Sequence, residues 1–316
     1  MMSIRIFLNA LFMLVIALCI RPDGVWAQET AANMPIADLH FHPDNRFSMT
    51  KVTEMVSEAG VRWFGLGGEN SAVTKYKKHF GDRFIAFGGQ WWMTGIYRRG
   101  GLRAMEDKNN PEFLELLAYL DHGLGEKTLV GIGEIFVNNQ NTNAQASNRR
   151  KMVIDGPVVR TLFDLAAKHD AFLAFHMEGS ANSVGELERL AFSNSKGRII
   201  LNHCGVNLPP SELDRLFSAH PNLFCEFSIR YPTSLKNYGG YQYFTTIFDS
   251  RAIGDAWKEV IVKHADRFMV GTDVDFDYNN YIESIKAVRS DLLAKLPIEV
   301  ARKVAYGNAQ VLFGLR

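Results

Sequence analysis

Residues that can bind a metal ion end several short apolar runs of this 316-residue sequence. The first such run closes with Asp38-Leu39-His40-Phe41-His42, and the alternation of side chains along a strand points His40 and His42 to the same side. Four later runs close with the other candidates, which are Glu134, His176, His203 and Asp273. Imidazole and carboxylate groups together suit divalent ions. The pattern predicts a divalent metal site, with Zn²⁺ as the expected ion.

The nine histidines fall into two groups, one expected to cap helices and one expected to bind the metal. Five histidines stand near the end of a helical stretch, just before the next apolar run, and these are His79, His122, His169, His220 and His264. A histidine there can bond the last helix carbonyls and face the negative end of the helix dipole. The other four end strands. Each of these could be satisfied singly by backbone or water, but candidates on five strand ends favour a shared site.

Eight apolar runs alternate with helical stretches, which is the rhythm of a (β/α)₈ TIM barrel. The runs are Ile36–His42, Val61–Gly67, Phe84–Gln90, Thr128–Ile135, Phe172–Glu178, Arg198–Gly205, Leu223–Ile229 and Phe268–Asp275. The expected helices include Glu112–Leu120, Val158–Ala167, Val184–Phe192, Ser211–Phe217, Ala256–Val262 and Tyr281–Ala287. A doubly wound open sheet also alternates, but no glycine-rich phosphate loop follows the first strand. We therefore predict a single-domain α/β barrel whose strand ends gather the candidate ligands on one face.

The N-terminus predicts a secretory signal peptide over residues 1–27. Arg5 precedes an apolar stretch from Ile6 to Ile20, and Val25-Trp26-Ala27 offers small residues for cleavage near Ala27. A membrane anchor is the alternative, but this stretch is short for a span of about 20 residues. We expect an N-terminal extension at 28–35, the barrel at 36–316, and a periplasmic or secreted protein without a stable membrane anchor. Export means an oxidising compartment, and the spacing of Cys204 and Cys225 leaves their pairing open.

The charge balance argues against a nucleic-acid partner. The sequence has 35 Lys and Arg residues against 34 Asp and Glu residues, so no basic excess is available to neutralise phosphates. With 47% hydrophobic residues and 22% charged residues the composition is that of a globular protein. We expect a small-molecule substrate and leave an oligomer open.

The ordered motifs resemble the amidohydrolase superfamily of metal-dependent hydrolases. They are the strand-end motifs together with the closing Gly307-Asn308-Ala309-Gln310-Val311-Leu312-Phe313, and the overlap runs from about Ile36 to the C-terminus. Within the superfamily the chain is most similar to the amidohydrolase-related group, which includes aminocarboxymuconate semialdehyde decarboxylase. Glu134 on the fourth strand is a feature shared with TatD-like hydrolases, where a Glu bridges two metals.

The resemblance implies a role for each candidate ligand. His40, His42 and Asp273 would hold the first metal, and Glu134 would bridge to a second. His176 and His203 would hold that second ion. In a one-metal member, His176 would join the first site and His203 would polarise the substrate. Asp273 and His203 are thus the expected catalytic residues, because a metal lowers the pKa of its water, Asp273 can take the proton, and His203 can stabilise an oxyanion.

Three long connections above the site suggest the substrate. They are Trp91–Arg99, Asn138–Asn148 and the segment from Arg230-Tyr231 to Phe244, and we expect them to be loops. Aromatic walls and an Arg suit an organic anion, although the same aromatics could pack as a rim. We predict that Arg230, Trp91 and Tyr231 bind substrate. Glu178 and Asp275 are expected to orient the metal ligands.

These observations favour an exported metal-dependent hydrolase that cleaves an ester, lactone, amide or similar bond. A metal-dependent decarboxylase is the alternative, because that activity occurs in the group that the chain resembles. A nuclease of the TatD kind is disfavoured by the neutral charge. A non-catalytic barrel that binds a ligand at its mouth would keep binding after metal removal.

Overall fold

The computed structural model describes residues 29–143, 145–230, 248–249, 252–274 and 278–316. The expected signal peptide, Tyr231 and Asp275 lie outside these ranges. Among the described helices, none combines the length and apolar character that a membrane span requires.

The predicted α/β fold with a parallel sheet is confirmed. The parallel strands are β1 (Ile36–Asp38), β2 (Val61–Phe64), β3 (Phe87–Gly89), β4 (Gly131–Phe136), β5 (Phe172–His176), β6 (Arg198–Asn202), β7 (Leu223–Glu226) and β10 (Phe268–Met269). One sheet has the order β10-β7-β6-β5-β4-β3, and β1 pairs with β2. Parallel bridges from Phe64 to Phe84 and from Asp38 to Val270 join the two sheets. The strands therefore follow one another around a ring, as the barrel prediction requires.

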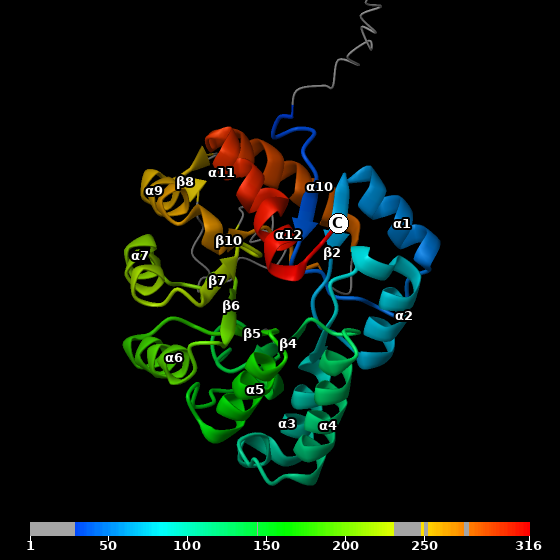
Figure 1. Cartoon of the computed structure of the whole chain (residues 1–316), viewed down its shortest axis with the longest axis vertical. Coiled ribbons are helices and arrows are strands. Elements are labelled where there is room, and N and C mark those ends of the chain that lie inside the picture. The colour runs from blue at the N-terminus through cyan, green and yellow to red at the C-terminus, as the bar shows by residue number, and fades with distance from the viewer. Residues whose placement is uncertain (1–28, 144, 231–247, 250–251, 275–277) are drawn as a thin grey trace, which may run out of the picture.

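The helices surround this ring of strands on the outside, except that the last of them, α12, lies across one end of the ring (Figure 1). They are α1 (Met49–Glu58), α2 (Asn70–Phe80), α3 (Gln90–Met105), α4 (Pro111–Gly125), α5 (Pro157–Lys168), α6 (Ala181–Ser193), α7 (Pro210–Ala219), α9 (Asp255–Lys263), α10 (Tyr281–Ala287), α11 (Ile298–Arg302) and α12 (Asn308–Phe313). A short antiparallel pair, β8 (Phe248–Asp249) and β9 (Ala252–Ile253), precedes α9. Each predicted helix falls within one of these elements.

Helix α5 shows why these segments fold as they do. Pro157 occupies the first turn, where its missing N–H costs nothing. Apolar residues then recur on one face, and Val159, Leu162 and Phe163 are buried against the strands. Packing of such a stripe stabilises a helix of this length more than its intrinsic propensity does.

The C-terminal helix closes one end of the ring. Its Phe313 ring lies 4.9 Å from the ring of Phe172 and 6.0 Å from that of Phe87, and both of these residues belong to the core inside the strands. The Asn308 side-chain amide donates to the carbonyls of Ala265 and Phe268 at 2.7 and 2.8 Å, which fixes the helix to the start of β10. Because Phe268 begins β10, this is the end at which the strands start. The carboxyl ends of the strands, where barrel proteins carry their functional residues, therefore lie at the opposite end.

The expected loop at Trp91–Arg99 is wrong. Helix α3 begins at Gln90, directly after β3, because Gly89 takes a left-handed φ of 99° and turns the chain from strand into helix without a connection. Trp, Thr and Gly have modest helix propensity, which favoured a loop in the sequence. Burial of Met93 and Ile96 against the core outweighs that preference.

Three of the five helix-end histidines contact carboxylates of neighbouring helices. His169 Nε2 lies 2.5 Å from an oxygen of Asp121 on α4, and His264 Nε2 lies 2.7 Å from an oxygen of Asp214 on α7. His220 makes a looser contact of 3.4 Å with Glu188 on α6. These histidines connect neighbouring helices just before β5, β7 and β10 begin, at the opposite end of the strands from the candidate ligands.

A disulfide joins Cys204, just after β6, to Cys225 in β7. The two cysteines are 21 residues apart in the sequence. Cys204 follows His203 and Cys225 precedes Glu226, so the bridge ties together two strand ends beside the candidate ligands. It resolves the pairing that the sequence left open.

We predict that the Cys204→Ala, Cys225→Ala double variant loses about 3 kcal/mol of unfolding free energy, because the bridge restricts the unfolded chain. Urea unfolding followed by circular dichroism would measure this, with chelator present throughout so that metal loss does not contribute. Wild-type protein in reductant should match the variant. Equal stability of reduced and oxidised wild type would contradict the prediction.

Candidate metal centre

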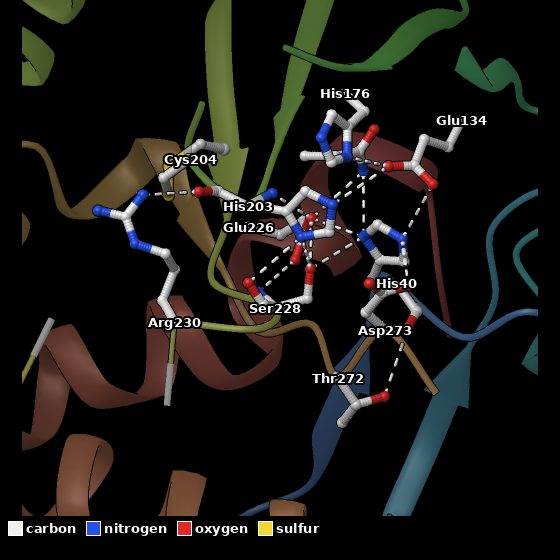
Figure 2. A network of polar contacts seen from close by, with 12 residues as sticks. His40, Glu134, His176, His203, Cys204, Glu226, Ser228, Arg230, Thr272 and Asp273 are labelled. Carbon is white, nitrogen blue, oxygen red and sulfur yellow. Dashed lines mark hydrogen bonds and ion pairs between the residues drawn. A yellow bond between two sulfur atoms is a disulfide. The ribbon is translucent and has the colours of Figure 1, made fainter. Parts of the chain in front are cut away.

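The predicted ligands meet at one end of the ring, close to the carboxyl ends of the strands (Figure 2). Glu134 belongs to β4 and His176 ends β5, whereas the remaining four residues stand within four positions after the ends of β1, β6 and β10. His40, His42, Glu134, His176 and His203 are buried, and the Asp273 side chain is 14% exposed. The closed ring of strands thus brings together residues that lie far apart in the sequence. His40 and Asp273, for example, are 233 positions apart.

Four donor atoms form a first set. His40 Nε2 and His42 Nε2 lie 3.1 Å apart, and each is 3.1 Å from Asp273 Oδ1. Glu134 Oε2 completes the set, at 3.4 Å from His40 Nε2 and 3.6 Å from His42 Nε2. A tetrahedral ion about 2.0–2.1 Å from each ligand needs ligand atoms about 3.3–3.4 Å apart. The spacing of this set therefore fits a single divalent ion.

A second set uses the other oxygen of the same carboxylate. Glu134 Oε1 lies 3.3 Å from His176 Nδ1 and 3.2 Å from His203 Nε2. The two oxygens of Glu134 thus face different groups of histidines. This is the arrangement that a carboxylate bridging two ions would have.

Each histidine presents one ring nitrogen to the cluster and the other to a protein partner. His40 Nδ1 lies 2.7 Å from Glu226 Oε1, and His42 Nδ1 lies 2.8 Å from the Gly67 carbonyl. His203 Nδ1 lies 2.7 Å from Ser228 Oγ, and His176 Nε2 lies 2.8 Å from Thr142 Oγ1. An acceptor on the outer nitrogen fixes the proton there and leaves the inner lone pair for a metal.

Glu226 is the partner that sequence reasoning missed. It is fully buried at the end of β7, and besides His40 its carboxylate accepts from the backbone N–H groups of His203 and Ser228 at 2.8 and 2.7 Å. A side chain at Gly271 would lie 2.0 Å from Glu226 Oε2, so the glycine before Thr272-Asp273 leaves room for this carboxylate. A signal was present in the sequence, since Glu226 is an acid in the middle of the seventh apolar run, Leu223–Ile229.

A second buried carboxylate braces the first strand against the last. Asp38 accepts the backbone N–H of His40 at 3.1 Å and that of Thr272 at 3.0 Å, and the Thr272 hydroxyl donates to it at 2.7 Å. The Asp273 N–H donates to the His40 carbonyl at 2.7 Å. These bonds fix His40 and Asp273 relative to each other, although they come from opposite ends of the chain.

The electrostatics of the cluster favour a cation. Burial alone would lower the pKa of His40, but the carboxylates of Asp273, Glu226 and Glu134 outweigh it and raise that pKa well above its ordinary value. Burial would raise the pKa of Glu134, but the charge of His40 and hydrogen bonds from the histidines hold it well below its ordinary value. Buried carboxylates of this kind require positive charge nearby.

A cavity of about 430 Å³ opens beside the ligands. His42, Glu134, His176, His203 and Asp273 form one wall, and the described residues of the other walls include Gln90, Trp91, Thr94, Arg98, Phe136, Thr142 and Arg150. Trp91 lies here as predicted, on the first turn of α3, although its substrate contact stays a prediction. Tyr231 lies outside the described residues.

The predicted substrate contact at Arg230 does not fit the structure. Its side chain is fully buried and its guanidinium donates to the carbonyls of His203, Val206 and Leu208. Figure 2 shows it on the far side of the His203 backbone from Glu134, and it is absent from the described lining of the cavity. Position after strand seven suggested a cavity contact, but the chain turns there and the side chain instead supports the segment that carries His203.

The stretch after β4 is tied down by Glu178, which the sequence placed near the ligands. Glu178 Oε1 accepts the backbone N–H groups of Asn141 and Thr142 at 2.6 and 2.9 Å, and the Thr142 hydroxyl at 2.9 Å. Because that hydroxyl also contacts His176 Nε2, Glu178 orients His176 through Thr142. The direct partner is a residue that the sequence did not single out.

The family comparison agrees with this geometry. A model of the amidohydrolase family matches residues 91–315, which is most of the chain. The protein therefore belongs to the amidohydrolase family, and the predicted resemblance is confirmed. A comparison with curated protein sequences finds no match.

Solved structures with the same fold include enzymes of two reaction types. A probable 2-pyrone-4,6-dicarboxylic acid hydrolase from Acinetobacter baumannii with citric acid bound is 14% identical, with a TM-score of 0.54 over 89% of this chain and 100% of that one. A dihydroxybenzoic acid decarboxylase from Polaromonas with bound manganese and 2-nitroresorcinol is 13% identical, with a TM-score of 0.53 over 89% and 96%. A TIM-barrel protein from Bordetella bronchiseptica is 14% identical, with a TM-score of 0.54 over 89% and 99%. At such identities the likeness shows the fold alone.

We predict that Glu226→Gln weakens Zn²⁺ binding roughly 10- to 100-fold, because the amide accepts less strongly from His40 Nδ1. Competition with a chromophoric chelator would measure the affinity. Glu186→Gln is the matched control, since Glu186 is also buried but accepts from Ile154 and Asn182, away from the cluster. Equal affinity in the two variants would show that Glu226 has only a structural role.

Proposed function

We propose that the protein is a metal-dependent hydrolase that uses a metal-activated water to cleave an ester, lactone, amide or similar bond of a small organic substrate. The observation that carries the proposal is the placement of Glu134. Its two oxygens face two groups of imidazole and carboxylate donors on the wall of a cavity that can hold a small molecule.

The ligand roles follow from the donor sets. His40, His42, Asp273 and Glu134 Oε2 would hold one ion, and His176, His203 and Glu134 Oε1 would hold a second. Zn²⁺ binds well to this mixture of nitrogen and oxygen donors, and other divalent transition-metal ions can bind to the same donors. A bound ion would supply Lewis acidity, lowering the pKa of water and polarising a carbonyl.

The protein residues would then move the proton and hold the charge. Asp273 would accept a proton from the attacking water and deliver it to the leaving group, because its carboxylate stands at the edge of the cavity. Its pKa is lowered, which keeps the carboxylate ionised and therefore able to accept. Burial raises that pKa, but the charge of His40 and hydrogen bonds from His40 and His42 outweigh it. With a single ion bound, Nε2 of His203 would not be a metal ligand; it would instead carry a proton and donate it in a hydrogen bond to the oxygen of the attacked group, which stabilises the charge there.

Decarboxylation is the second candidate. The structures that share this fold include a manganese-containing dihydroxybenzoic acid decarboxylase, so the architecture is compatible with that reaction. The two reactions differ in the fate of water. Hydrolysis in ¹⁸O-labelled water transfers label to the organic product. Decarboxylation releases CO₂ and leaves the organic product unlabelled.

We also propose that the chain is exported, with cleavage of residues 1–27. The disulfide between Cys204 and Cys225 supports an oxidising compartment. N-terminal sequencing of protein from a fractionated host should begin at Gln28. An intact Met1 on protein found only in the cytoplasm would refute this part of the proposal.

Removing the metal should abolish turnover. We predict that dialysis against a chelator reduces hydrolysis of a panel of small esters, lactones and amides to background, and that Zn²⁺ or Mn²⁺ restores it. Metal analysis of the purified protein should give one or two equivalents. Full activity in metal-free, folded protein would overturn the proposal, and metal-independent ligand binding without turnover would favour a non-catalytic barrel.

Asp273→Asn should retain the fold and lose roughly 10²- to 10⁴-fold in kcat at saturating metal, because an amide cannot accept the proton. Circular dichroism would confirm folding, and the rate would be measured on the best substrate of the panel. Asp214→Asn, on the surface of α7 beside His264, serves as the control and should keep wild-type kcat. Wild-type turnover by Asp273→Asn would remove this residue from the role of base.

A further inference from the structure

Arg150 is a buried cation on the cavity wall. It lies between β4 and α5, its exposed fraction is 3%, and it lines the cavity that also contains the candidate ligands. Sequence reasoning did not single it out, because it stands in an Asn-rich connection far from any strand end. A buried guanidinium ordinarily has a carboxylate beside it, since removing a charge from water is costly.

The guanidinium of Arg150 donates to neutral groups. Its Nε donates to the Phe136 carbonyl at 3.1 Å, Nη1 to the Asn148 carbonyl at 3.0 Å, and Nη2 to Thr94 Oγ1 at 3.0 Å. Within the described part of the chain, no carboxylate lies within ion-pair distance of it. A guanidinium has five N–H donors, so these contacts leave one on each terminal nitrogen.

Aromatic residues hold the guanidinium without neutralising it. Its carbon lies 4.9 Å from the centre of the Tyr97 ring and 5.1 Å from that of Phe136. Burial lowers the pKa of Arg150 to about 10, which keeps the group protonated at neutral pH. The side chain is therefore a rigid, oriented positive charge.

Phe136 sets the distance from this charge to the metal ligands. Its ring centre lies 5.4 Å from the ring of His176 and 5.1 Å from the Arg150 guanidinium carbon. The guanidinium carbon and the centre of the His176 ring are therefore no more than about 10.5 Å apart, a span that one aromatic ring with a substituent at each end can bridge. A ligand that reaches both ends needs a body of similar length, and the cavity of about 430 Å³ accommodates it.

We propose that Arg150 anchors a carboxylate of the substrate, so that the cavity selects small organic acids whose reacting group lies about one ring away at the metal ligands. The proposal rests on the proposed function, because it places the reacting group at the metal centre. The planar fork of a guanidinium matches the two oxygens of a carboxylate. Trp91 and Arg98, stacked with the guanidinium carbon 5.5 Å from the ring centre, line the same cavity.

The test uses ligands with a metal-binding group at one end. Benzohydroxamic acid is compared with its 3- and 4-carboxyl derivatives and with the carbamoyl isosteres, by calorimetry on the Zn²⁺-loaded protein. For wild type we expect one carboxyl derivative to bind at least roughly tenfold more tightly than its carbamoyl isostere, because the charged pair forms in a desolvated site.

Arg150→Met should remove that preference and leave benzohydroxamic acid affinity within about twofold. Arg149→Met is the matched control, because Arg149 is exposed, lies outside the described lining of the cavity, and carries the same charge. It should keep the preference. Arg150→Lys retains the positive charge but loses the planar guanidinium, so it should keep only part of the preference for the carboxyl derivative. If Arg150→Met does not fold, Arg150→Lys takes its place in the test.

The outcomes separate the two proposals. Zinc-dependent binding of benzohydroxamic acid without any carboxyl preference, or with a preference that survives Arg150→Met, would overturn the anion site and leave the metal centre intact. Hydroxamate binding that does not depend on metal would instead overturn the proposed function. Loss of the preference in both Arg150→Met and Arg149→Met would assign it to general charge rather than to this site.

Discussion

The need of buried carboxylates for positive charge is the constraint on which this structure depends. Glu134, Asp273 and Glu226 lie with four histidines at one end of the strand ring, where Glu134 and Glu226 are buried and the Asp273 side chain is only 14% exposed. Desolvating several carboxylates is costly unless a cation or donors surround them. The histidine nitrogens meet part of that need, and the spacing of the inner donors suits divalent ions. Glu134 is central because one of its oxygens faces His40 and His42 and the other faces His176 and His203.

The two ends of the strand ring have different roles. Residues at one end position the metal ligands, and the C-terminal helix covers the other end. Asp38 fastens the first strand to the segment after the last, and Glu226 holds His40 and the backbone of His203 together. At the other end Phe313 packs into the ring. This division matches the general pattern of (β/α)₈ enzymes, in which loops after the strands carry chemistry and the opposite face carries stability.

Two buried arginines illustrate how the same residue type serves different ends. Arg230 donates to backbone carbonyls behind His203 and stabilises the segment that positions that ligand. Arg150 also donates to neutral groups, but it lines the cavity. The difference lies in which side of the chain each guanidinium occupies, and it makes Arg150 the better candidate for contact with a substrate anion.

The sequence by itself determined the alternation of strands and helices, the family, and the residues that gather at the strand ends. Apolar runs and strand-end polar residues are local features, so composition and order are enough to find them. Only the tertiary structure decided that Glu226 supports His40, that Arg150 rather than Arg230 lines the cavity, and that Trp91 lies in the first turn of a helix. Those outcomes depend on which side chains approach across the ring, and such contacts between distant segments leave no local pattern in the chain.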